Sequence, residues 1–186
     1  MVIDYVLMFA LYSLLGWMME TLFASAIQKR FVNRGFLIGP ITPIYGFGAI
    51  LVIASLNCVL LLEMAPFMTE VSSLILSVIL VTALEYLTGY LLERIFRAKW
   101  WDYSGHFLNI NGYICLKYTL LWGILAFILI QVIHPQITNF IDLLPEVLKV
   151  FLAFVFVVCF AIDFLVSIKI AFGMSRSSTN KTDSSP

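Results

Sequence analysis

Five long apolar stretches constrain this chain more than any other feature. A helix that crosses a bilayer needs about 20 mostly apolar residues, and the stretches at 2–27, 36–62, 71–96, 113–133 and 147–172 all reach that length. Hydrophobic residues make up 62% of the chain and charged residues only 12%, and a folded soluble protein could not cover that much apolar surface. The sequence therefore predicts an all-α, polytopic membrane bundle of five transmembrane helices, with the lipid bilayer as its main partner.

The basic residues of the loops predict how this bundle is oriented. Cytoplasmic loops carry an excess of Lys and Arg. The first loop, the third loop and the C-terminal tail hold such residues, namely Lys29, Arg30, Arg34, Arg97, Lys99, Arg176 and Lys181. We therefore expect the N-terminus outside and the C-terminus inside. Residues 1–173 would form the transmembrane domain, and the polar residues 174–186 would form a disordered cytoplasmic tail.

The sequence shows no features typical of several functional classes. The formal net charge is zero, so nothing suggests a nucleic-acid partner. The cysteines Cys58, Cys115 and Cys159 lie far apart without metal-ligand spacing, and we expect neither a metal nor a cofactor. A phosphate-binding loop, a His-Glu zinc motif and a Ser/His/Asp set are also missing, which makes an enzyme the less favoured interpretation.

Acidic residues within the apolar stretches are the main functional candidates. A carboxylate in the hydrocarbon core costs about 2.5–3.5 kcal/mol on insertion scales, so Glu20, Glu85, Glu93 and Asp163 should face the bundle interior or a wet cavity. Glu85 and Glu93 lie on one helical stripe because they are separated by two turns. Two interpretations remain open: these residues join helices through hydrogen bonds, or they form a substrate or ion site. Glu85 is the best functional candidate, since it is deepest and has no basic neighbour in sequence.

The start of the second apolar stretch is rich in glycine and proline. Proline removes backbone donors and disfavours helix in the preceding residue. The candidates for a helix break are Gly39, Pro40, Pro43 and Gly46. Free N–H groups at such a break, beside Arg34, would form an anion site. The alternative is an ordinary helix start with proline in its first position.

The third loop is aromatic and short, which is typical of a loop that lies on the membrane surface. Asn111-Gly112 predicts a turn before the fourth helix. We expect Glu20, Glu85 and Arg34 to form one pocket open to the cytoplasm, with Trp101-Asp102-Tyr103 as its lid. The full set of candidate substrate-binding residues is Glu20, Asn33, Arg34, Glu85, Glu93, Trp101, Asp102, Tyr103 and Asn111.

A set of short motifs gives the chain a family resemblance. They are Gly16-Trp17 followed by Glu20, Asn33-Arg34-Gly35, Gly39-Pro40, Pro43-Ile44-Tyr45-Gly46, Trp101-Asp102-Tyr103, Asn111-Gly112 and Trp122-Gly123. Together they resemble the bacterial membrane family called "putative ABC-transporter type IV" (CmpB-like permeases). The resemblance covers the first four predicted helices, and the fifth matches only in being apolar.

The resemblance implies a permease-like subunit in the bacterial cytoplasmic membrane. Because the chain has no ATPase motif, such a role would require a separate ATPase subunit, together with a second copy of the chain or another permease. Two alternatives stay open. The chain could be a membrane-embedded enzyme that acts on lipid or lipid-linked substrates, with Glu85 or Glu20 as acid or base, or a structural or regulatory membrane protein.

Overall fold

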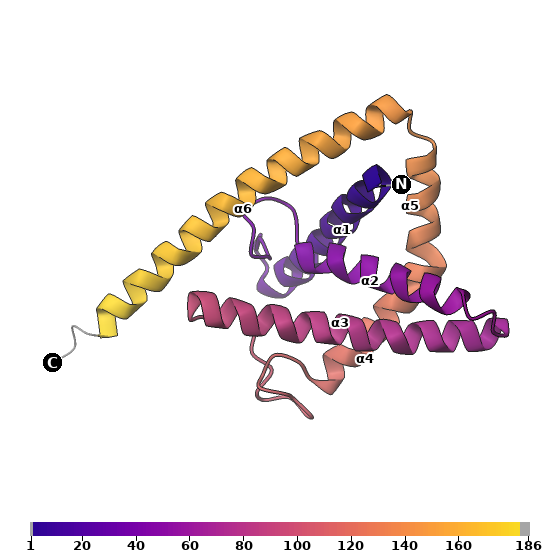
Figure 1. The fold of residues 1–186 in the computed structure, drawn as a ribbon. Coiled ribbons are helices and arrows are strands. Elements are labelled where there is room, and N and C mark those ends of the chain that lie inside the picture. The colour runs from indigo at the N-terminus through magenta and orange to yellow at the C-terminus, as the bar shows by residue number, and fades with distance from the viewer. Residues whose placement is uncertain (1, 183–186) are drawn as a thin grey trace.

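The computed structural model describes residues 2–182, with side chains through Gly173. Its helices are α1 (Val2–Gln28), α2 (Pro43–Leu60), α3 (Pro66–Phe96), α4 (Leu116–Ile128), the π-helical turn η1 (Leu129–Ile133), α5 (His134–Asp142) and α6 (Glu146–Thr182) (Figure 1). Since α4, η1 and α5 form one continuous stretch, five segments are long and apolar enough to cross a membrane. The predicted fold class is confirmed, whereas the orientation of the termini stays a prediction.

Prolines determine where two of the helices begin, one later and one earlier in the sequence than the hydropathy pattern predicts. The second span begins at Pro43 rather than at residue 36, and the third begins at Pro66 rather than at residue 71. A proline in the first helical turn loses no hydrogen bond, because the N–H groups there have no intrahelical partner. The segment before Pro43 is irregular, as the Gly39-Pro40 pair predicts.

The last two spans also extend beyond their predicted ends. The fourth continues through Pro135 to Asp142, past the predicted end at residue 133. Because Pro135 cannot donate a helical hydrogen bond, the π-helical turn η1 directly before it accommodates the altered bonding. Helix α6 runs to Thr182, into the segment predicted as a disordered tail; residues 183–186 lie outside the described part of the chain.

Helix α2 lies between α1 and α3 and is the centre of the packing. Its buried residues are Gly46, Gly48, Ala49, Val52, Ile53, Ser55 and Val59. Helix α3 presents small residues at every fourth position, including Thr69, Ser73 and Ser77, and such residues let helices approach closely in a membrane. The Ser73 and Ser77 hydroxyls donate to backbone carbonyls of their own helix. These polar residues therefore serve packing without needing a partner on another helix.

Helix α6 is the most peripheral element. It meets α5 at a corner and then runs diagonally past α1 toward the C-terminal end of α3 (Figure 1), where Phe172 packs on Phe96. Its contacts are mainly with α1, with a smaller contact to α3. Most of its large apolar side chains are exposed, among them Phe154 and Val157, which is the arrangement expected of a surface that faces lipid.

Candidate functional site

The irregular segment before α2 is folded back onto the helices that surround it. The indole Nε1 of Trp17 on α1 donates to Oδ1 of Asn33 at 2.6 Å. The Asn33 amide in turn donates to the carbonyl oxygen of Ile38 at 2.7 Å. Further along, the N–H of Thr42 donates to the carbonyl of Ser13 on α1. Irregular backbone at membrane depth needs such partners, and Asn33 supplies one from inside the segment.

A carboxylate from α6 binds the backbone of the same segment. Asp163 accepts hydrogen bonds from the N–H groups of Ile38 (3.1 Å) and Gly39 (2.9 Å), and the Ser167 hydroxyl donates to it as well. A Cβ at position 39 would come within 2.8 Å of Asp163 Oδ2, so glycine is needed for this approach. The free N–H groups predicted at this break are thus occupied by an anion, which belongs to the chain itself.

The contact between α1 and α2 brings Tyr45 onto Glu20. Gly16 lies directly under the Tyr45 ring, and a Cβ there would overlap the ring. This close approach lets the Tyr45 hydroxyl donate to Oε1 of Glu20 at 2.7 Å. Gly46, predicted as part of a helix break, instead lies inside α2. There it leaves room for the side chains of Ser13 and Phe9.

Glu85 on α3 lies next to this pair and is almost completely buried, with 4% of its surface exposed. Its Oε2 accepts a hydrogen bond from Nε1 of Trp122 on α4 at 3.0 Å, and its Oε1 accepts one from the Tyr103 hydroxyl at 3.3 Å. The Trp122 ring also packs against the Tyr45 ring, with 5.4 Å between centroids. Four elements, namely α1, α2, α3 and α4, therefore converge on two carboxylates.

Aromatic rings of the third loop cover this group of residues. The Tyr103 ring stacks on Tyr118 of α4 at 4.3 Å between centroids, and His106 stacks near both at 5.8 Å. Burial is the main cause that raises the pKa of the Tyr103 hydroxyl above its ordinary value, and the negative charge of Glu85 adds to it. Tyr103 therefore stays protonated and acts as a hydrogen-bond donor toward Glu85.

A second polar network fixes the base of the loop. The Tyr113 hydroxyl donates to Glu93 at 2.7 Å, and the Lys99 ammonium lies 3.9 Å from Glu93 and 3.6 Å from Asp102. Hydrogen bonds from the Ser104 hydroxyl and N–H lower the pKa of Asp102, and Lys99 lowers it further. These contacts are partly exposed, so they order the loop more than they stabilise the bundle.

The turn that leads from the third loop into α4 forms as the sequence predicts. The N–H of Tyr113 donates to the carbonyl of Ile110, and Asn111 and Gly112 between them have φ values of 54° and 74°. Two positive φ angles in succession define a type I′ turn, for which Asn-Gly is the favoured pair. The Asn111 amide also donates to the Tyr86 hydroxyl at 2.9 Å, which fixes the turn against α3.

The structure thus brings some candidate residues together and separates others. Glu20, Glu85 and Tyr103 share one cluster with Tyr45 and Trp122, which we call the acidic cluster. Asn33 contacts Trp17 and the segment before α2. The candidates Glu93, Asp102 and Asn111 belong to the loop network, together with Trp101, whose indole donates to the Tyr113 carbonyl.

Arg34 stands apart from these groups. Its backbone N–H donates to the Thr21 hydroxyl, and its side chain forms no ion pair with a carboxylate among the contacts of the described residues. An ion pair of Arg34 with Glu20 or Glu85 is thus not among these contacts, and the pocket that Arg34 is expected to share with them stays a prediction.

Sequence reasoning named Asp163 among the acidic candidates but left it out of the substrate-binding set, and it assigned no site role to Tyr45 or Trp122. Each was visible: Tyr45 precedes Gly46 in a motif, Trp122 precedes Gly123, and Asp163 shares a helical face with Ser167. A polar or aromatic side chain next to glycine on an apolar helix is the signal that could have identified the first two, because glycine marks close helix contact.

Comparison with known proteins relates the chain to one protein family. Residues 7–168 match the family model described as "Putative ABC-transporter type IV", a range that extends into α6 beyond the motifs of the first four helices. Neither a curated protein nor a solved structure matches the chain.

Proposed function

Since this chain belongs to the family described as "Putative ABC-transporter type IV", we propose that it is the membrane-embedded, permease-like subunit of a transporter in the bacterial cytoplasmic membrane. The acidic cluster is its substrate site and opens toward the cytoplasm, with Tyr103 and its loop as the cover. The ATP-driven step belongs to a separate ATPase, because residues with a phosphate-loop pattern do not occur in this sequence. A second copy of the chain completes the transport path.

One observation carries this proposal: two membrane-embedded carboxylates have aromatic donors as their partners. Tyr45 donates to Glu20, and Trp122 and Tyr103 donate to Glu85. Among the described residues, the ion pairs involve neither Glu20 nor Glu85. Ionisable residues inside a membrane are rare and commonly mark a pathway for substrate or ions.

The chemistry of the acidic cluster favours a cationic substrate. A positive charge would pair with the two carboxylates, which have only hydrogen-bond donors as partners among the described residues. An anionic substrate is less favoured at the break before α2, because Asp163 already accepts from the N–H groups of Ile38 and Gly39.

Binding of small cations tests the proposal. The purified full chain would be titrated with tetramethylammonium, ethylamine and, as an anion, sulfate, while thermal unfolding is monitored. We expect the two cations to raise the unfolding temperature and Glu85→Gln to abolish that rise while membrane insertion stays normal. Glu63→Gln, in the exposed turn after α2, is the matched control and should respond like the natural chain. A response to sulfate alone would contradict the proposal, and a chemically modified lipid in the sample would favour the enzyme alternative.

A further inference from the structure

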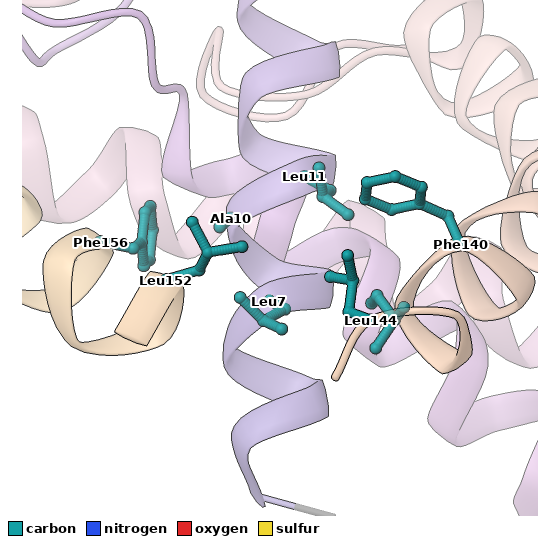
Figure 2. Close-up of a pocket in the computed structure, with 8 residues that line it drawn as sticks. Leu7, Ala10, Leu11, Phe140, Leu144, Leu152 and Phe156 are labelled. Atoms are coloured by element: carbon teal, nitrogen blue, oxygen red, sulfur yellow. The ribbon is translucent and has the colours of Figure 1, made fainter. Parts of the chain in front are cut away.

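A half-enclosed hollow of about 200 Å³ lies between α1, α5 and α6. Figure 2 shows its side chains projecting toward one another from the three helices. Leu7 and Ala10 come from α1, Phe140 from α5, and Leu152 and Phe156 from α6. All the lining side chains are hydrocarbon, so ordered water would find no partner there. An apolar occupant suits this hollow.

Ionic residues stand at one end of this hollow on the helices that line it. Asp4 precedes Leu7 by one helical turn, and Lys149 precedes Leu152 by one turn. The Lys149 ammonium lies 3.3 Å from Asp4 and 3.0 Å from Glu146. These contacts join the ends of α1 and α6, and because charged groups are costly inside a bilayer, we infer that this end of the hollow lies at the membrane surface.

The charges at this end favour a positively charged group. The Lys149 side chain is only 8% exposed and already lies between two carboxylates, whereas the Glu146 side chain is 79% exposed. Asp142, which follows the lining residue Ile141, is exposed as well. A ligand that approaches from the water therefore meets the exposed carboxylates of Glu146 and Asp142, which attract positive charge, rather than the buried ammonium of Lys149.

We propose that the hollow binds one acyl chain of a phospholipid whose headgroup carries a protonated primary amine. The acyl chain lies against Ala10, the smallest lining residue, between Leu152 and Phe140. The ammonium of the headgroup pairs with the exposed carboxylate of Glu146. This site is separate from the acidic cluster and does not depend on the proposed transport function.

Native mass spectrometry of the full chain in detergent tests the lipid site. Equal amounts of phosphatidylethanolamine, phosphatidylcholine and phosphatidylglycerol with identical acyl chains would be added. We expect one bound lipid per chain, with phosphatidylethanolamine preferred about two- to fivefold, the ratio that one exposed ion pair supports. Equal retention of the three lipids would overturn the headgroup assignment, and a dimer without lipid would show that a second copy covers the hollow.

Two variants separate the acyl and headgroup contributions. Ala10→Phe fills the hollow and should reduce lipid retention about tenfold, whereas Ile79→Phe adds the same ring at an exposed position of α3 and should leave retention unchanged. Glu146→Gln keeps the hollow, so it should retain lipid but lose the preference for the amine. Retention by Ala10→Phe at the level of the natural chain would overturn the site, and if that variant fails to fold, the result for Glu146→Gln alone decides the headgroup assignment.

Discussion

Trp122 on α4 donates a 3.0 Å hydrogen bond from Nε1 to Oε2 of Glu85 on α3, a side chain with only 4% of its surface exposed. A carboxylate buried to this extent is costly unless it is hydrogen-bonded, so each of its donors contributes to stability. The bond also explains why tryptophan stands at position 122 in the wall of the acidic cluster, where phenylalanine would supply the same ring contact to Tyr45 without a donor.

The first prediction follows from this bond. Trp122→Phe should lower the free energy of unfolding by about 1–3 kcal/mol, the cost of a buried polar group left without its partner. Unfolding in detergent by sodium dodecyl sulfate measures this change. In the background of Glu85→Gln the same substitution should cost clearly less, because the charged acceptor is gone. Equal costs in both backgrounds would show that the bond does not form.

The second prediction concerns the contact of α1 with α2. Gly46→Ala should lower the unfolding temperature of the purified protein, because a Cβ there overlaps Ser13 and Phe9. Overpacking of this kind typically costs about 1–3 kcal/mol. Gly105→Ala is the control, since nothing lies within 4 Å of its Cβ position, and it should unfold like the natural chain. A similar result for both variants would argue against the close helix contact.

The third prediction concerns the carboxylate that binds the segment before α2. Asp163→Ala leaves the N–H groups of Ile38 and Gly39 without their acceptor, and we expect the segment to exchange its amide hydrogens much faster. Asp163→Asn keeps one oxygen acceptor and should have an intermediate effect. Hydrogen exchange measured by mass spectrometry on peptides that cover residues 33–42 reports the change. Protection that is unaffected in both variants would remove Asp163 from this role.

The fourth prediction tests the orientation of the chain in the membrane. The basic first loop should lie in the cytoplasm and the turn between α5 and α6 outside. Single cysteines at Arg30 and Leu143, both at exposed positions, would be introduced into a variant without native cysteines. A membrane-impermeant thiol reagent added to intact cells should label the cysteine at 143 only. Labelling of both from the same side is incompatible with five spans.

The sequence contains enough information for the fold class but not for the contacts between helices. Apolar length predicts the five spans, Gly39-Pro40 predicts the irregular segment, and Asn111-Gly112 predicts the turn. Each of these is a local property, set by backbone sterics or by the thickness of a bilayer.

The acidic cluster depends on helix rotations that no local pattern specifies. Hydropathy shows that Glu20 and Glu85 avoid lipid, but not which residue faces them. Tyr45 reaches Glu20 only because Gly16 allows α2 to approach. The expected role of Arg34 rests on its place in the sequence, which does not specify where its side chain lies in the fold.

The π-helical turn η1 has a consequence for the two halves of the fourth span. Bonding from residue i to i+5 inserts the equivalent of one extra residue, which rotates all that follows by about 100° around the helix axis. Helix α4 before the turn contacts α3, whereas α5 after it contacts α1, where Tyr12 bonds His134. The fourth span therefore presents one surface to α3 before the turn and a differently oriented surface to α1 after it. Deleting a single residue between 129 and 133 would rotate Ile137 and Ile141 away from α1 toward lipid and leave the contact between α4 and α3 unchanged.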